Sequence, residues 1–333
     1  MTEMPKLTKK DFSSDQEVKW CPGCGDYAIL SATQMAMSKI GIPPHKVCVV
    51  SGIGCSSRFP YYMNSYGMHS IHGRAPAVAT GVKAQNPDLS VWIITGDGDS
   101  LSIGGNHLAH ILRRNLDVNI LLFNNEIYGL TKGQYSPTSK IGTKTKSSPY
   151  GSIDRRFTPA KFAFGAGATF FARTIDTDPK HMMEVMQLAH NHKGTSLIEV
   201  YQNCNIFNDG VHDEYTHRNT RDEFSIRLEA GKPMIFGKEL DKGLIREGFN
   251  FKVVDLAGHE DQLIVHDPKD ENLSQLLTNL NGSNGPIPIG VLRDIDSDIY
   301  EVDMHKQIAD QVAKKGKGKF QDILFSGNTW EVN

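Results

Sequence analysis

The stretch from residue 91 to residue 138 constrains the fold of this chain most, because it contains two apolar runs joined by a helical pattern. Residues 91–95 (VWIIT) are rich in β-branched side chains, which is typical of a buried parallel strand. Residues 97–99 (DGD) are expected to form a tight loop before the helix. Residues 118–123 (VNILLF) predict a second buried strand. This βαβ order predicts that the loops after both strands open at one edge of a parallel sheet, where open α/β folds bind ligands.

The two loops carry groups that suit a magnesium ion and a diphosphate. Asp97 follows the first strand and Asn125 follows the second, so the βαβ geometry brings them together. With a peptide carbonyl, these side chains can hold a Mg²⁺ whose other positions are filled by diphosphate oxygens and water. Glycines allow a diphosphate to approach the backbone closely; they are Gly96, Gly98, Gly104 and Gly105.

A bare Gly-Asp-Gly is also a common turn, but here it is followed after a spacer by two asparagines. GDG followed at this distance by NN closely resembles the thiamine diphosphate signature. On that resemblance the metal ligands are Asp97, Asn125 and the backbone carbonyl of Ile127.

Composition argues against several classes of protein. The 333 residues suffice for one large core and an appendage, and the formal net charge of −2 argues against a nucleic-acid surface. The N-terminal residues are charged and lack the apolar core of a signal peptide. No apolar run approaches the roughly 18 residues that a membrane-spanning helix needs. We therefore expect a cytoplasmic enzyme without nucleic-acid or membrane partners.

Four of the five cysteines fall in turns or at strand ends: Cys21, Cys24, Cys55 and Cys204. Because the chain shows no secretion signal, metal binding or catalysis is expected rather than disulfide formation. Four such cysteines could hold zinc or an iron–sulfur cluster, and the number of ligands does not decide between them. Cys48 lies inside an apolar strand and is expected to be an inert core residue.

A wider set of motifs resembles one family. The segments are CPGCGDY, SGIGCSSR, HGRA, GDGDSLSIGGNH and NNEIYGLTKGQYSPT. Together they resemble the β subunit of 2-oxoacid:ferredoxin oxidoreductases, over about residues 20–205. In that family thiamine diphosphate lies beside a [4Fe–4S] cluster, and the resemblance assigns the cluster to Cys21, Cys24, Cys55 and Cys204. It also places a set of residues against the thiamine cofactor: Ile53, Gly54, Cys55, Ser56, His72, Gly96, Gly98, Asp99, Gly129 and Leu130.

Two of these assignments have plainer alternatives. His72 could be a capping or surface histidine in a glycine-rich turn. Asp99 could simply cap the helix that follows it.

The expected fold is of the α/β class, with a parallel-sheet thiamine diphosphate-binding domain and a smaller C-terminal extension. We expect an N-terminal arm at 1–19, the cofactor and iron–sulfur domain at 20–212, and the extension at 213–333. Charged, alternating and turn-rich stretches in the extension predict β hairpins near residues 234–238 and 249–255.

The chain lacks a second α/β module, which in thiamine enzymes carries the carboxylate that acts on the aminopyrimidine. The resemblance places that module on an α subunit, so the chain is expected to form half of an active site, in αβ pairs that dimerise. It implies oxidative decarboxylation of a 2-oxoacid to the acyl-CoA and carbon dioxide, with coenzyme A as co-substrate. Electrons would pass through the cluster to ferredoxin, and with a low-potential electron donor the same steps could run in reverse.

Two other classes of function remain open. A non-oxidative thiamine decarboxylase or carboligase would use the same metal loops but would not need the loop cysteines. A non-catalytic electron-transfer subunit would need the cysteines but not the GDG and NN motifs.

The loop after NN bears on the substrate. Pyruvate-using relatives typically have TGGQ there, whereas this chain has LTKGQ, so Lys132 replaces a glycine. Lys132, with Arg58, could pair with the distal carboxylate of a dicarboxylic 2-oxoacid, which makes 2-oxoglutarate the expected substrate. Both join His72 as candidate catalytic residues. If Lys132 is only a surface lysine, a broad-specificity or pyruvate-type enzyme is the alternative.

Overall fold

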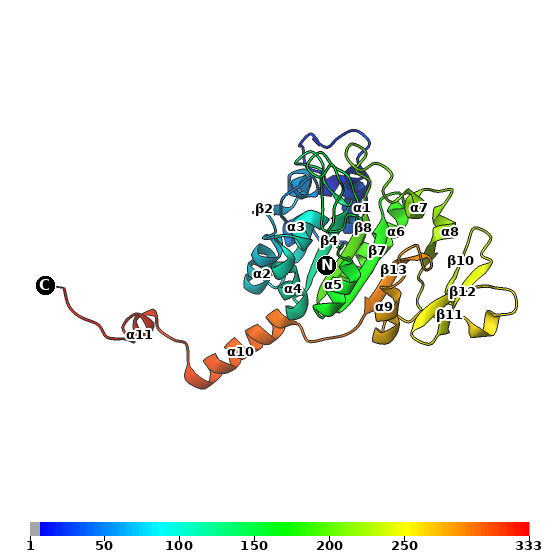
Figure 1. Cartoon of the computed structure of the whole chain (residues 1–333). Helices are drawn as coiled ribbons and strands as arrows, with labels where there is room; N and C mark the ends of the chain where they lie inside the picture. Colours follow the sequence, from blue (N-terminus) through cyan, green and yellow to red (C-terminus); the bar gives the residue numbers. More distant parts are fainter. Residues whose placement is uncertain (1–6, 333) are drawn as a thin grey trace.

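Eight strands form the main sheet in the computed structural model, which describes residues 7–332 (Figure 1). From one edge to the other they are β2 (Tyr66–His69), β1 (Val47–Ser51), β3 (Ser90–Gly96), β4 (Val118–Asn124), β8 (Thr195–Tyr201), β7 (Phe170–Ile175), β13 (Ile287–Asp294) and β9 (Ser225–Arg227). All neighbouring strands are parallel except β13 and β7, which are antiparallel. The predicted α/β class with a mostly parallel sheet is confirmed.

Helices cover both faces of this sheet because each central strand buries side chains in two directions. In β3, Val91 and Ile93 pack into one core, and Trp92 and Ile94 pack into the other. The first core is covered by α2 (Ala75–Gln85), α4 (Gly105–Arg114), α5 (Pro159–Gly165) and α9 (Glu271–Leu277). The second is covered by α1 (Asp26–Ile40), α6 (Pro179–Asn191) and the 3-10 helix η3 (Ser56–Tyr62).

The predicted βαβ unit is present, with one correction. Strands β3 and β4 lie side by side and parallel, as expected. The loop predicted at residues 97–99 is wrong, because these residues form the first turn of α3 (Asp97–Leu101). Acidic side chains suit that position, since the amino end of a helix carries partial positive charge. A break around Gly104 then separates α3 from α4, and a side chain at Gly104 would lie 2.4 Å from the carbonyl oxygen of Asp99.

The predicted C-terminal extension contributes two strands to the main sheet. Both β13 and β9 lie beyond residue 212, and β13 pairs with β7. A separate antiparallel sheet contains β10 (Ile235–Phe236), β11 (Lys242–Glu247) and β12 (Asn250–Asp255), close to the predicted hairpins. The same part of the chain contains three short helices: α7 (Asp213–Thr216), α8 (Arg221–Phe224) and η4 (Glu260–Gln262). The main sheet therefore contains strands from both sides of residue 212. The domain boundary at that residue stays a prediction from the change in sequence composition.

The two ends of the chain differ in how they meet the body. At the N-terminus, residues 1–6 of the predicted arm lie outside the described residues, and η1 (Lys9–Phe12) buries Phe12. A further 3-10 turn, η2, spans Pro44–Lys46. At the C-terminus, α10 (Tyr300–Lys315) and α11 (Phe320–Leu324) project away from the sheet (Figure 1). Within residues 7–332, no helix is long and apolar enough to span a bilayer.

Candidate active site

A cavity lies at the carboxyl ends of β1, β3 and β4. Every residue that the sequence placed against the thiamine cofactor lines it: Ile53, Gly54, Cys55, Ser56, His72, Gly96, Gly98, Asp99, Gly129 and Leu130. The predicted metal ligands Asp97, Asn125 and Ile127 line the same cavity. Loops that are distant in sequence thus meet at the sheet edge where the βαβ argument placed a ligand.

Asp99 joins two of the loops that form the wall of this cavity. Its carboxylate is buried, and Oδ1 accepts hydrogen bonds from the backbone N–H groups of Ile53 (3.1 Å) and Gly73 (2.7 Å). Oδ2 accepts one from the Thr95 hydroxyl at 2.8 Å. His72 Nδ1 lies 2.8 Å from Oδ1, within ion-pair distance but without hydrogen-bond alignment. Asp99 therefore does more than cap a helix, because it fixes the loops that carry Ile53 and His72.

Asp97 and Asn125 are held by different neighbours. Asp97 is 2% exposed, and the Ser136 hydroxyl donates to its Oδ2 at 2.6 Å. Burial raises the pKa of Asp97 to about 6, although hydrogen bonds from Ser136 and Thr138 act in the opposite direction. The Asn125 amide nitrogen donates to Gln202 at 2.7 Å. Both side chains are thus oriented by hydrogen bonds at the cavity wall.

Gly98 lets the start of α3 pack against the next loop. A Cβ atom at this position would lie 2.2 Å from the Tyr128 ring, so a larger residue would displace that ring. The Tyr128 hydroxyl donates to the Gly98 carbonyl at 3.0 Å. Tyr128 belongs to β5 (Ile127–Tyr128), which pairs with β6 (Gln134–Tyr135) in a small hairpin.

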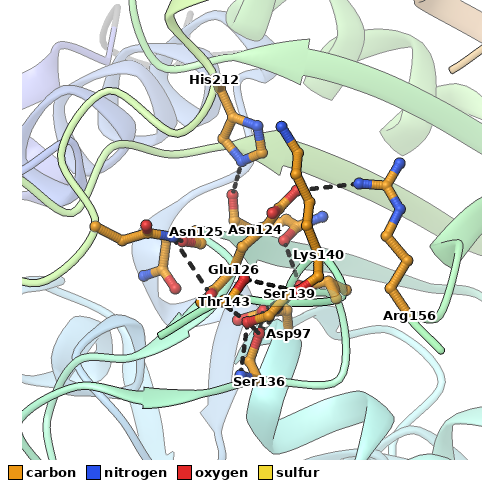
Figure 2. Close-up of polar contacts among 12 residues, drawn as sticks. Asp97, Asn124, Asn125, Glu126, Ser136, Ser139, Lys140, Thr143, Arg156 and His212 are labelled. Carbon is orange, nitrogen blue, oxygen red and sulfur yellow. Dashed lines mark hydrogen bonds and ion pairs between the residues drawn. The ribbon is translucent and has the colours of Figure 1, made fainter. Parts of the chain in front are cut away.

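Residues distant in sequence contact Asn124, Asn125 and Glu126, which we call the asparagine loop (Figure 2). His212 Nε2 lies 2.9 Å from the Asn124 carbonyl oxygen, and the Ser139 hydroxyl donates to the Glu126 carbonyl at 2.6 Å. The Glu126 side chain is buried and lies 3.5 Å from Arg156. Burial raises the pKa of Glu126 to about 7, although the positive charge of Arg156 acts in the opposite direction. The loop that bears Asn125 is therefore fixed on both sides.

A second pocket adjoins the cavity and is lined by four of the five cysteines: Cys21, Cys24, Cys55 and Cys204. Five residues line both spaces: Asp26, Cys55, Asn125, Gly129 and Leu130. A Cβ atom on Gly129 would lie 3.5 Å from the Cys204 sulfur and 3.8 Å from the Cys55 sulfur. The hypothesis that these four cysteines share one site thus agrees with their placement, whereas Cys48 is buried in β1.

The thiols of this pocket are not arranged around one point. Within the described part of the chain, no three His, Cys, Asp or Glu side chains are grouped as ligands of a single metal ion. Burial, together with nearby Asp26 and Cys204, raises the pKa of the Cys55 thiol to about 12. Burial likewise raises the pKa of the Cys24 thiol. Binding of metal at these thiols would have to release their protons.

The three candidate catalytic residues are divided between the two spaces. His72 lines the cavity, whereas Arg58 and Lys132 line the cysteine pocket and not the cavity. Arg58 Nε donates to the Tyr62 hydroxyl at 3.0 Å. Lys132 is exposed and has a left-handed backbone, with φ of 75°.

Sequence reasoning missed several residues of the site. Asp26 is 1% exposed and lines both spaces, and burial raises the pKa of its carboxyl group to about 7. Glu126 and His212 were not considered, because their contacts depend on the tertiary fold. Ser136 and Thr138 had a signal, since they belong to the motif NNEIYGLTKGQYSPT, but the motif alone did not give them a role.

Comparison with known proteins agrees with this geometry. The family described as thiamine pyrophosphate enzyme, C-terminal TPP binding domain, matches residues 52–200, which include most of the cavity. The 2-oxoglutarate oxidoreductase subunit KorB of Mycobacterium tuberculosis is 47% identical over 338 residues, covering 100% of this chain and 90% of the relative. The β subunit of 2-oxoacid:ferredoxin oxidoreductase 1 from Aeropyrum pernix is 48% identical over 190 residues, covering 57% of this chain and 60% of the relative.

A solved structure shares the fold over nearly the whole chain. It is the 2-oxoglutarate:ferredoxin oxidoreductase from Magnetococcus marinus with 2-oxoglutarate, coenzyme A and succinyl-CoA bound. The two chains are 31% identical with a TM-score of 0.77, and the match covers 98% of this chain and 97% of the other.

Proposed function

This chain belongs to the family of 2-oxoacid:ferredoxin oxidoreductase β subunits, and we propose that it forms the thiamine diphosphate-binding half of a 2-oxoglutarate:ferredoxin oxidoreductase. The enzyme would convert 2-oxoglutarate and coenzyme A to succinyl-CoA and carbon dioxide and pass electrons to ferredoxin. The observation that carries this proposal is the single cavity that gathers the GDG loop, the NN loop and the His72 loop. The names of the full-length relative and of the solved structure support 2-oxoglutarate as substrate.

The cavity wall fits a magnesium diphosphate. In the proposal, Asp97, Asn125 and the Ile127 carbonyl hold Mg²⁺, which prefers oxygen ligands and keeps positions for phosphate oxygens. Gly96 and Gly98 leave room for the diphosphate at the start of α3. When bound, thiamine diphosphate supplies the carbon nucleophile and the electron sink for decarboxylation. The residues of this chain bind and orient it.

We propose that the cysteine pocket holds a [4Fe–4S] cluster and not a single metal ion. Thiolates around a four-iron core stand apart from one another, whereas the ligands of one zinc ion must converge on one point. The four cysteines line one pocket, and among the described residues no three of them are grouped as ligands of a single ion. Lys19, Arg58 and Lys132 line the same pocket and would offset the negative charge of a thiolate-bound cluster. The shared wall at Cys55 and Gly129 would keep the cluster next to the cofactor.

The chain would complete its active site with a partner. Residues 7–332 contain one large α/β sheet, and the other two sheets have three and two strands. A carboxylate for the aminopyrimidine would therefore come from an α subunit, in a dimer of αβ pairs, with ferredoxin as the electron acceptor. The names of the relatives, which are given as subunits, support a heteromeric enzyme.

Substrate choice depends on the loop that carries Lys132. Lys132 and Arg58 line the cysteine pocket beside the wall it shares with the cavity, so any carboxylate they bind would lie near that wall. A charge-assisted hydrogen bond contributes about 1.5–3 kcal/mol, or roughly 10- to 150-fold in preference. Lys132→Gly should lower kcat/KM for 2-oxoglutarate by that order and leave activity on pyruvate unchanged or higher. Lys144→Gly, in an exposed loop, serves as the control.

A parallel loss on 2-oxoglutarate and pyruvate in Lys132→Gly would contradict this role for Lys132. The enzyme would then be better described as a broad-specificity or pyruvate-type 2-oxoacid oxidoreductase.

The function itself is tested with the two-subunit enzyme purified without oxygen. We expect release of carbon dioxide from 2-oxoglutarate that requires coenzyme A and is matched by reduction of ferredoxin. Release of carbon dioxide that needs neither would instead identify a non-oxidative thiamine decarboxylase.

A further inference from the structure

Three buried hydroxyl groups of one short segment lie behind the proposed metal loops. They belong to Ser136, Thr138 and Ser139, which are 2%, 2% and 3% exposed, and we call them the hydroxyl bracket. The segment follows β6 and turns tightly, since the Ser139 N–H donates to the Ser136 carbonyl at 3.1 Å. The turn brings the three hydroxyls into contact with polar atoms of Asp97, Asn124 and Glu126.

Two members of the hydroxyl bracket engage the same oxygen of Asp97. The Ser136 hydroxyl donates to Asp97 Oδ2 at 2.6 Å, and the Thr138 hydroxyl also donates to it. Among the described residues, no side chain donates to the other oxygen, Oδ1, while Asp97 lines the cavity. The bracket therefore restrains rotation of the carboxylate and leaves Oδ1 available as a ligand.

The hydroxyl bracket also reaches the asparagine loop. Thr138 Oγ1 lies 2.9 Å from Asn124 Oδ1, and the amide nitrogen of Asn124 donates to Glu199 at 2.8 Å. The orientation of the Asn124 amide is thus set, with its oxygen toward Thr138. The Ser139 hydroxyl donates to the Glu126 carbonyl at 2.6 Å, on the other side of Asn125 (Figure 2). One segment therefore contacts both loops from which the proposed metal ligands come.

We propose that Ser136 and Thr138 are positioning residues for the metal: they orient Asp97 and fix its loop relative to the loop of Asn125. The inference rests on the proposed function, in which Asp97 and Asn125 hold Mg²⁺. Neither Ser136 nor Thr138 lines the cavity, so the proposal gives their hydroxyls no contact with the cofactor or the substrate. Groups that orient a metal ligand commonly change metal affinity by roughly 10- to 100-fold when they are removed.

The experiment measures Mn²⁺ binding, as a paramagnetic substitute for Mg²⁺, to the assembled enzyme with thiamine diphosphate present. Thr138→Val keeps the shape of the side chain and removes its hydroxyl, and we expect the Kd for Mn²⁺ to rise about 10- to 100-fold. Thr138→Ser restores a hydroxyl and should bind Mn²⁺ nearly as the natural chain does. Thr195→Val is the matched control, because the buried Thr195 hydroxyl donates to the Leu116 carbonyl at 2.7 Å and Thr195 does not line the cavity.

The outcomes separate this inference from the proposed function. If the natural enzyme shows no Mn²⁺ binding that depends on thiamine diphosphate, the proposed function fails. If the natural enzyme binds Mn²⁺ and Thr138→Val binds it equally well, the positioning role is overturned. An equal loss in Thr138→Ser and Thr138→Val would also overturn it, because shape and not the hydroxyl would then matter. If Thr138→Val does not fold, Ser136→Ala provides the same comparison with the same expected rise in Kd.

Discussion

Arg173 and Glu199 form a buried ion pair close to the asparagine loop. Arg173 Nε lies 2.8 Å from Glu199 Oε2, and the two side chains are 4% and 1% exposed. The other oxygen of Glu199 accepts the hydrogen bond from Asn124. The pair thus connects β7 and β8 to the residue next to Asn125. Its contribution to activity would come through the position of that loop.

Breaking this pair should destabilise the chain strongly. Arg173→Met leaves Glu199 buried without its partner, and we expect the free energy of unfolding to fall by about 3–5 kcal/mol. The control is Arg227→Met, which removes the partner of Asp178 in a pair where Arg227 is 38% exposed; a loss of about 0–1 kcal/mol is expected. Urea unfolding measures both values. An equal loss of unfolding free energy in the two variants would contradict the claim that burial makes the Arg173–Glu199 pair more costly to break.

The cysteines give a second prediction for single residues. Cys21 lines the pocket proposed for the cluster, whereas Cys48 is buried in β1. In anaerobically purified enzyme, Cys21→Ser should lose most of the iron and the brown absorbance. Cys48→Ala should keep both, because it removes no ligand. Equal iron loss in the two variants, measured by iron analysis, would show that the cysteine assignment is wrong.

Among the elements, the two strands of the βαβ unit, β3 and β4, could be predicted from sequence because they are buried on both sides. Continuous apolar runs such as residues 118–123 have few alternatives to a central parallel strand. The GDG segment was harder, since Asp and Gly suit both a turn and the start of a helix. The roles of Ser136 and Thr138 could not be predicted, because their partner Asp97 is brought to them only by the packing of the β5–β6 hairpin region against α3.

Helix α10 is anchored to the rest of the protein near its N-terminal end. The Glu301 carboxylate is 1% exposed and accepts a hydrogen bond from the Asp117 N–H at 3.1 Å, with Lys83 at 4.0 Å. Residues 305–332 are exposed. The anchor and the projecting part of α10 should therefore contribute very differently to the stability of the isolated chain.

Ending the chain after His305 should change the free energy of unfolding by no more than about 0.5 kcal/mol, because residues 306–332 are exposed. Glu301→Gln should lower it by about 1–3 kcal/mol, since it weakens a buried acceptor beside Lys83. Denaturant unfolding of both variants measures the difference. A loss on truncation as large as that of Glu301→Gln would mean that the end of the chain packs on the body.

For the molecule as a whole, the two adjoining spaces support an active site to which two different subunits contribute residues. This chain supplies the cavity with Asp97 and Asn125 and the pocket with the cysteines. Within the described residues, the rest of the chain forms two small sheets and the helices that pack on the main sheet. The proposal therefore requires that turnover belong to the assembly and not to this chain.

The most direct test compares turnover by this chain, by its partner subunit and by the two together. Each sample contains Mg²⁺, thiamine diphosphate, coenzyme A, 2-oxoglutarate and ferredoxin, without oxygen. The proposal predicts ferredoxin reduction only in the mixture, and its loss when the mixture contains Asp97→Ala. Sustained reduction of ferredoxin by this chain alone would contradict the central claim that it is half of an active site.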